Sequence, residues 1–174
     1  MTYSTGNIIA DSCRLCLSYT EKLLTDIPPE LFARFAAPGG EPIASNHPAF
    51  VLGHLSLYPP RIVRAWGQER GLVDVPTSFE TVFSKDAQCE DDPDGSIYPH
   101  RDTIVEAFFQ GYRTIIDRLR ELDEEVLQRA NPNEAMAKRF PTLGSMHAFY
   151  CGGHLMVHLG QLSAWRRMAG LGSA

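Results

Sequence analysis

The sequence lacks long apolar runs and any excess of positive charge. No window of the 174-residue chain approaches the ~18 uninterrupted apolar residues of a membrane-spanning helix. Residues 1–10 lack a basic stretch followed by an apolar one, so we expect no secretory signal and a cytoplasmic protein. The 16 Lys and Arg against 21 Asp and Glu give a net charge of −5. Because nucleic-acid binders present a basic face, we expect neither nucleic acid nor membrane as a partner.

Several well-known catalytic motifs are absent as well. The sequence contains no Walker A motif, no G-x-G-x-x-G and no G-x-S-x-G, so no motif indicates nucleotide binding or serine-hydrolase chemistry. It contains no E-x-x-H pair, which the di-iron helical bundles require. No internal repeat of fixed period and no low-complexity tract interrupts the chain.

The composition is that of an ordinary globular domain. Apolar residues make up 44% of the chain and charged residues 21%, close to the averages of soluble domains. A chain of this length can bury a core without disulfide or metal crosslinks. We therefore expect residues 1–174 to form a single domain.

The four cysteines first suggest redox or zinc chemistry, because Cys13 and Cys16 form a C-x-x-C motif; the others are Cys89 and Cys151. No βαβ pattern surrounds the motif and no second C-x-x-C follows it. Both cysteines instead lie on an apolar stripe with helical spacing. The stripe consists of Ile9, Cys13, Cys16, Thr20, Leu23 and Ile27. We interpret Cys13 and Cys16 as buried thiols of the core.

Four segments show the apolar spacing of helices. They cover about residues 5–26, 46–66, 105–126 and 143–168. No segment shows a convincing strand pattern, so we predict an all-α fold, and four long helices in one domain indicate a four-helix bundle. Helical neighbours in a bundle are usually joined by about 2–8 residues. The longer connection at 67–100 indicates that the second and third helices are not simple antiparallel neighbours.

The second helix carries its own boundary signals. Ser45 or Asn46 can cap its start, and Pro48 suits its first turn. Pro59 and Pro60 fall inside its apolar pattern and cannot donate backbone hydrogen bonds. We therefore predict a kink one turn beyond the middle of this helix.

Boundary signals also mark the second half of the chain. The Asn-Pro-Asn at 131–133 should end the third helix, Thr142 can cap the fourth, and Gly170 and Gly172 should end it. The acidic block at 90–94 resembles part of a calcium loop but lacks the full ligand spacing, so we interpret it as a solvated turn.

The fourth helix contains His154 and His158, four residues apart. On a helix this spacing places both imidazoles on one face, where they can ligate one metal ion or serve as two ordinary polar-face histidines. Neighbouring apolar residues and Gly153 favour the interior, where a polar group needs a partner. Leu155 occupies the position of the glutamate in H-E-x-x-H metalloproteases, which argues against that class.

A third ligand should come from another helix, and His54 is the best candidate. It lies among apolar residues in the middle of the second helix, beside Gly53. A single histidine there would usually be a hydrogen-bonded core residue, but helical bundles build metal sites from facing helices. We predict a divalent-metal site at His54, His154 and His158, with zinc or nickel as the ion. Three neutral imidazoles leave the full 2+ charge of the ion and an open position for water or substrate.

Four further residues can line the pocket beyond the metal. His47 and His147 each precede a predicted ligand by seven residues, which at about 100° per residue places them near the same helix face; the alternative is a polar residue at a helix start. Cys151 lies one turn before the fourth-helix pair and either reaches the pocket or is a buried thiol. Gln161 can hydrogen-bond a ligand or a metal-bound water, or be an ordinary surface residue.

Two segments together resemble the DinB/YfiT-like superfamily. Residues 46–55, NHPAFVLGHL, are similar to its second-helix segment, and residues 153–162, GHLMVHLGQL, to its H-x-x-x-H-x-G-Q segment in the fourth helix. The resemblance implies a four-helix bundle in which the second and third helices run the same way, and a divalent metal on His54, His154 and His158. It also implies a homodimer, and relatives that transfer low-molecular-weight thiols. The long loop at 36–45 departs from the family core.

Three hypotheses about function follow. The first is a metal-dependent enzyme, a thiol-dependent S-transferase acting on a small-molecule substrate, in which the metal raises the reactive fraction of a bound thiol. The second is a non-catalytic metal or small-ligand binding module, because no obvious acid–base pair accompanies the histidines. The third is a structural helical dimer whose histidines only pack.

Overall fold

The computed structural model describes residues 3–67 and 73–174 of the chain. Over these ranges the protein is all-helical, which confirms the predicted class; they contain no strand, only an isolated bridge between Ala130 and Thr142. The helices are α1 (Thr5–Leu24), α2 (Pro48–Ser56), α3 (Tyr58–Ala65), α4 (Ser78–Phe83), α5 (Arg101–Glu121), α6 (Glu124–Gln128), α7 (Glu134–Ala137), α8 (Leu143–Ala148) and α9 (His154–Met168).

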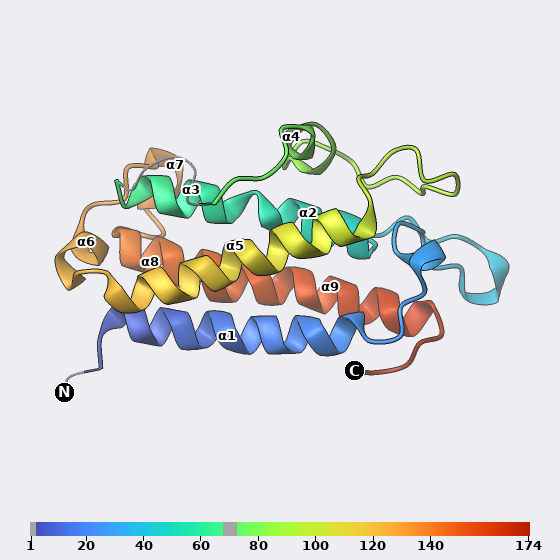
Figure 1. Cartoon of the computed structure of the whole chain (residues 1–174), viewed down its shortest axis with the longest axis horizontal. Coiled ribbons are helices and arrows are strands. Elements are labelled where there is room, and N and C mark those ends of the chain that lie inside the picture. Colours follow the sequence, from blue (N-terminus) through green and yellow to red (C-terminus); the bar gives the residue numbers. More distant parts are fainter. Residues whose placement is uncertain (1–2, 68–72) are drawn as a thin grey trace.

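The long helices lie side by side (Figure 1), with both α1 and α2 in contact with α5 and α9. Helices α1 and α9 run in one direction, whereas the α2–α3 pair and α5 run in the other. The chain must therefore return along the length of the molecule between α3 and α5. The connection that carries α4 makes this return, which agrees with the interpretation that these helices are not simple antiparallel neighbours. None of the helices described is long and apolar enough to cross a membrane.

The kink predicted in the second helix is confirmed. Helix α2 ends at Ser56 and α3 begins at Tyr58, because Pro59 and Pro60 cannot donate to the carbonyl groups one turn back. One of the carbonyls left free, that of Leu55, accepts a hydrogen bond from the buried hydroxyl of Tyr112 at 3.1 Å. The break is thus satisfied inside the core.

The predicted cap of α2 is wrong, whereas the cap of α8 is confirmed. His47, rather than Ser45 or Asn46, caps α2 by accepting a hydrogen bond from the backbone N–H of Phe50 on its Nδ1. Pro48 fixes the first helical residue, so the residue directly before it takes the cap position. At α8, Thr142 caps through a reciprocal pair of hydrogen bonds with the third residue of that helix.

Two predicted helices are also interrupted. The third ends at Glu121, and Val126 belongs to the separate helix α6, which packs on α1 and α8 and therefore continues the apolar pattern beyond the break. The fourth is divided by a π-helical turn, η3 (Phe149–Gly153), between α8 and α9. Sequence periodicity cannot detect either change, since both preserve the burial of apolar residues.

The acidic block is only partly a solvated turn. Asp91 forms a two-pronged ion pair with Arg34, at 2.9 and 3.0 Å. Asp92 is buried and accepts hydrogen bonds from three backbone N–H groups, those of residues 96–98. These contacts attach the loop to the helical body and compensate the burial of the charge.

The core extends along the contacts between the long helices. Cys13 and Cys16 are buried in it as free thiols, which confirms the interpretation of the C-x-x-C motif. At one end of the molecule α1 crosses α5 at Gly6, where an added Cβ would overlap the backbone oxygen of Leu119. Only glycine allows this close approach.

We expect Gly6→Ala to destabilise the protein by about 1–3 kcal/mol, because the Cβ would force two packed helices apart. Gly160→Ala is the matched control, since a Cβ at this helical position meets nothing within 4 Å. It should stabilise the protein by about 0.5–1 kcal/mol. Urea denaturation measures both changes, and a Gly6→Ala variant as stable as Gly160→Ala would contradict the close approach.

Candidate metal centre

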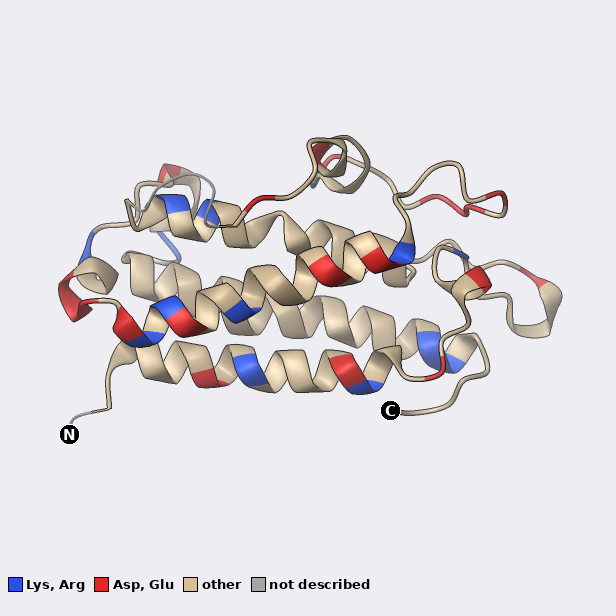
Figure 2. Cartoon of the chain, viewed as in Figure 1, with Lys and Arg blue, Asp and Glu red and all other residues tan. Residues whose placement is uncertain are grey.

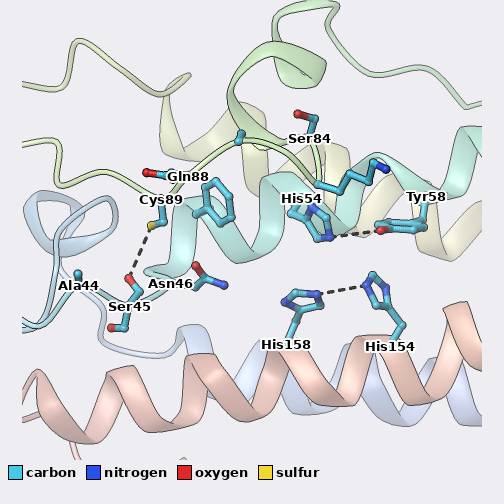
Figure 3. A pocket seen from close by; sticks show the side chains of 13 residues that line it. Ala44, Ser45, Asn46, His54, Tyr58, Ser84, Gln88, Cys89, His154 and His158 are labelled. Atoms are coloured by element: carbon cyan, nitrogen blue, oxygen red, sulfur yellow. Dashed lines mark hydrogen bonds between the residues drawn. The ribbon is translucent and has the colours of Figure 1, made fainter.

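The structure brings the three predicted histidines together. His54 projects from α2, and His154 and His158 project from α9 toward it (Figure 3). One ring nitrogen from each lies within 4.8 Å of the other two. His54 is 8% exposed and the other two are half-buried, so the cluster forms the inner wall of a cavity.

The backbone sets the tautomer of His54. Its Nδ1 lies 2.8 Å from the backbone oxygen of Phe83, which can only accept, so Nδ1 carries the proton and Nε2 the lone pair. Phe83 reaches this position because Gly53 has no side chain; a Cβ there would overlap its ring. Metal-binding histidines characteristically donate their other N–H to a carbonyl or carboxylate in this way.

A side-chain network orients His158. Its Nδ1 lies 2.9 Å from Oε1 of Gln161, and the same oxygen accepts a hydrogen bond from Asn46 Nδ2 at 3.0 Å. With Oε1 as the acceptor, His158 donates from Nδ1 and directs its Nε2 lone pair toward the cluster. Gln161 is not among the residues that line the cavity, so its predicted hydrogen bond to a ligand or a metal-bound water is replaced by these contacts with His158 and Asn46.

Neither tautomer of His154 satisfies both of its ring nitrogens among the described residues. Its Nε2 lies 3.2 Å from Nε2 of His158, and its buried Nδ1 has no partner in the described structure. If Nδ1 holds the proton, that N–H is unsatisfied and two lone pairs face each other. If Nε2 holds it, a buried lone pair on Nδ1 is unsatisfied. A cation on the facing nitrogens removes the opposition between the lone pairs.

The surroundings keep all three imidazoles in the neutral form that binds metals. Burial, followed by the charges of His158 and His54, lowers the pKa of His154 to about 3. Burial is also the main cause that lowers the pKa values of His54 and His158. The site therefore requires no deprotonation near pH 7 before it accepts an ion.

A cavity of about 580 Å³ opens beside the histidines. Tyr58 forms part of its wall, with its hydroxyl oxygen 3.3 Å from His54 Nε2. Burial raises the pKa of Tyr58, so the hydroxyl keeps its proton and can donate to a group bound there. The lining residues are Ala44, Ser45, Asn46, Phe50, His54, Tyr58, Ser84, Lys85, Ala87, Gln88, Cys89, His154 and His158.

Neither of the two histidines expected beside the ligands is among the lining residues. His47 is buried at the cap of α2, and its Nε2 contacts the backbone oxygen of Glu90 at 2.9 Å. His147 is buried as well, and its Nδ1 accepts a hydrogen bond from Trp66 Nε1 at 2.9 Å. The prediction that residues seven apart share a helix face requires a continuous helix. His47, however, precedes its helix, and η3 separates His147 from His154.

Cys151 does not line the cavity either. It lies inside η3, where the wider π turn changes the direction of side chains relative to an α-helix, and it is fully buried. Its alternative interpretation, a buried thiol, agrees with this position.

The sequence interpretation missed Tyr58, Lys85 and Cys89 as cavity residues. Tyr58 had a signal, since it follows His54 by four residues, although the helix breaks between them. Lys85 and Cys89 lie in the irregular connection after α4, where no periodicity indicates which side chains face inward. Burial raises the pKa of Cys89 to about 11, so its thiol stays protonated at neutral pH.

Comparisons with known proteins give no assignment for this arrangement: no family model matches the chain, and no curated protein matches it.

Proposed function

We propose that the protein is a divalent-metal-dependent enzyme that transfers a low-molecular-weight thiol to a small electrophilic substrate. The observation that carries the proposal is the convergence of His54, His154 and His158 from two helices, with ring nitrogens within 4.8 Å of one another. The orientation of two of these rings by hydrogen bonds on their outer nitrogens supports it further.

In this proposal the three imidazoles hold zinc or nickel. The bound ion would supply Lewis acidity and lower the pKa of a thiol in its open position. The chain's own residues bind and orient the reactants. Tyr58 offers a hydroxyl donor beside His54, and Asn46 and Gln88 offer amides along the cavity wall.

The reacting thiol must come from outside the chain. Cys13, Cys16 and Cys151 are fully or almost fully buried, and the raised pKa of Cys89 leaves little thiolate. In the transfer, the sulfur of the added thiol forms a bond to an electrophilic carbon. The leaving group departs with its bonding electrons, and the thiol proton passes to solvent.

The resemblance of residues 46–55 and 153–162 to DinB/YfiT-like proteins supports the same proposal. It extends the proposal to a four-helix bundle formed by α1, α2–α3, α5 and α8–α9 as a single domain. It also extends it to a cytoplasmic homodimer.

One observation favours a second candidate, a non-catalytic metal or small-ligand binding module. No carboxylate is among the residues that line the cavity in the described part of the chain, so no Asp or Glu stands beside the histidines as a general base. Turnover separates the two candidates.

The test combines metal analysis with turnover. We expect the isolated protein to contain close to one equivalent of zinc or nickel, and the loaded protein to accelerate the reaction of glutathione, bacillithiol or mycothiol with chlorodinitrobenzene. Chelation should remove the rate, and re-addition should restore it. A protein that binds metal but accelerates none of these reactions is the binding module, and one that binds no metal contradicts both candidates.

A further inference from the structure

The charge balance of the cavity differs from that of the protein around it. Although the chain has a net charge of −5, the cavity wall contains Lys85 and no Asp or Glu among the described residues. Two other surface hollows contain more carboxylates than basic side chains. One has Asp102, Glu106 and Asp117 with Arg113, and the other has Glu30, Asp92 and Asp94 with Arg34 and Arg101. A third hollow has Glu21 and Asp117 but also three arginines, so the cavity differs from all three in having no carboxylate.

The helices that hold the histidines do not compensate a bound cation. Helix α2 contains no charged residue, and in α9 the charges begin only at Arg166. In Figure 2 the acidic residues lie on the loops and on other helices. In the acidic block, Asp91 is paired with Arg34 and Asp92 with backbone N–H groups. Asp86 and Glu90 follow the lining residues Lys85 and Cys89 in the sequence but are exposed and do not line the cavity.

Lys85 lies near the three histidines because it belongs to the same segment as Phe83, which orients His54. It follows Phe83 by two residues, so its Cα lies within about 7 Å of the backbone whose oxygen accepts the His54 hydrogen bond. Its ammonium forms no ion pair in the described structure, and Ser84 and Gln88 line the cavity on either side of it in the sequence. A cation flanked by hydroxyl and amide donors suits a carboxylate.

We propose that the substrate of this site is a small organic anion, whose carboxylate binds Lys85 while its other end faces the three histidines. The proposal rests on the proposed metal site. The 2+ ion on three neutral imidazoles, together with the ammonium, leaves positive charge in a cavity without carboxylates, and an anionic substrate supplies the missing negative charge. A volume of about 580 Å³ accommodates a molecule of this size.

Binding of succinate and of its neutral analogue succinamide to the zinc-loaded protein tests the inference by calorimetry. We expect succinate to bind about tenfold more tightly, and Lys85→Gln to weaken succinate about fivefold while leaving succinamide unchanged. Lys138→Gln is the matched control, because Lys138 is exposed and does not line the cavity. It should change neither affinity.

The zinc content of the same samples separates the two possible failures. A sample that takes up no zinc overturns the proposed function and this inference with it. Zinc at about one equivalent, with equal affinity for succinate and succinamide, overturns only the anionic substrate. The role of Lys85 is overturned if the Lys85→Gln and Lys138→Gln variants bind succinate equally tightly.

Discussion

Replacing His154 with alanine should lower the zinc affinity of the protein by more than about 100-fold. Loss of a hydrogen-bonding partner behind a metal ligand already costs about 10–100-fold, and His154→Ala removes a ligand itself. The structure gives a specific reason, because Nε2 of His154 faces that of His158, and the buried Nδ1 of His154 has no partner among the described residues. Competition with a chromophoric zinc chelator measures the affinity.

Two further variants should lower the zinc affinity less than His154→Ala does. Gln161→Leu keeps all three ligands but removes the oxygen that accepts from His158, so it should lose about 10–100-fold. His100→Asn alters an exposed histidine that caps α5, and Asn keeps a capping group, so zinc affinity should not change. The largest loss of zinc affinity in His154→Ala supports His154 as a ligand. A smaller loss in Gln161→Leu, with none in His100→Asn, supports Gln161 as the residue that positions His158.

Folding of the His154→Ala variant can be monitored in the same experiment. Zinc should raise the melting temperature of the unmodified protein and not that of the variant, because only a native state that binds the ion is stabilised by it. If the variant folds and its affinity stays within threefold of the original, the three-histidine site is wrong. If zinc raises both melting temperatures equally, the ion binds elsewhere.

The cluster of three histidines could be predicted from sequence because its members follow simple helical geometry. His154 and His158 are one turn apart on an unbroken stretch of α9, and His54 lies within α2 before its break. Spacing of this kind survives folding as long as the helix is regular. The Pro59–Pro60 kink could be predicted for an equally local reason, since proline removes specific hydrogen bonds whatever surrounds it.

The cavity wall could not be predicted in this way. The π turn η3 leaves no apolar signature, yet it separates the faces of His147 and Cys151 from that of His154. Lys85 and Cys89 reach the cavity through tertiary packing of the connection after α4, which includes the contact of Phe83 with Gly53. These positions depend on contacts between segments distant in sequence, which periodicity does not encode.

The protein should lose much of its stability between pH 6.5 and pH 4, because two histidines outside the cluster of His54, His154 and His158 are buried in the neutral form. Burial lowers the pKa of His47 to about 4 and that of His147 to about 4 as well. Each also uses its Nδ1 lone pair as an acceptor, from Phe50 N–H and from Trp66 Nε1–H. Protonation would place an N–H against each of these donors.

The direction of the pH dependence follows from the lowered pKa values. Between pH 6.5 and 4 the unfolded chain binds protons on these histidines that the folded chain does not, so stability falls as pH falls. The contribution is fully present above pH 6.5 and is lost toward pH 4. A pKa difference of about 2.5 corresponds to roughly 3 kcal/mol for each side chain. Together they approach the whole stability of a typical domain, about 5–15 kcal/mol.

Urea denaturation at half-unit steps of pH measures this loss, and two variants assign it. His47→Asn keeps a helix cap and His147→Gln keeps an acceptor for Trp66, but neither replacement titrates. Each should reduce the slope of unfolding free energy against pH by about 1.4 kcal/mol per unit near pH 5. Because His54, His154 and His158 remain in both variants, their contribution cancels in the comparison. Unchanged slopes in both variants would show that acid acts on other groups, and that burial at α2 and α8 does not hold these histidines neutral.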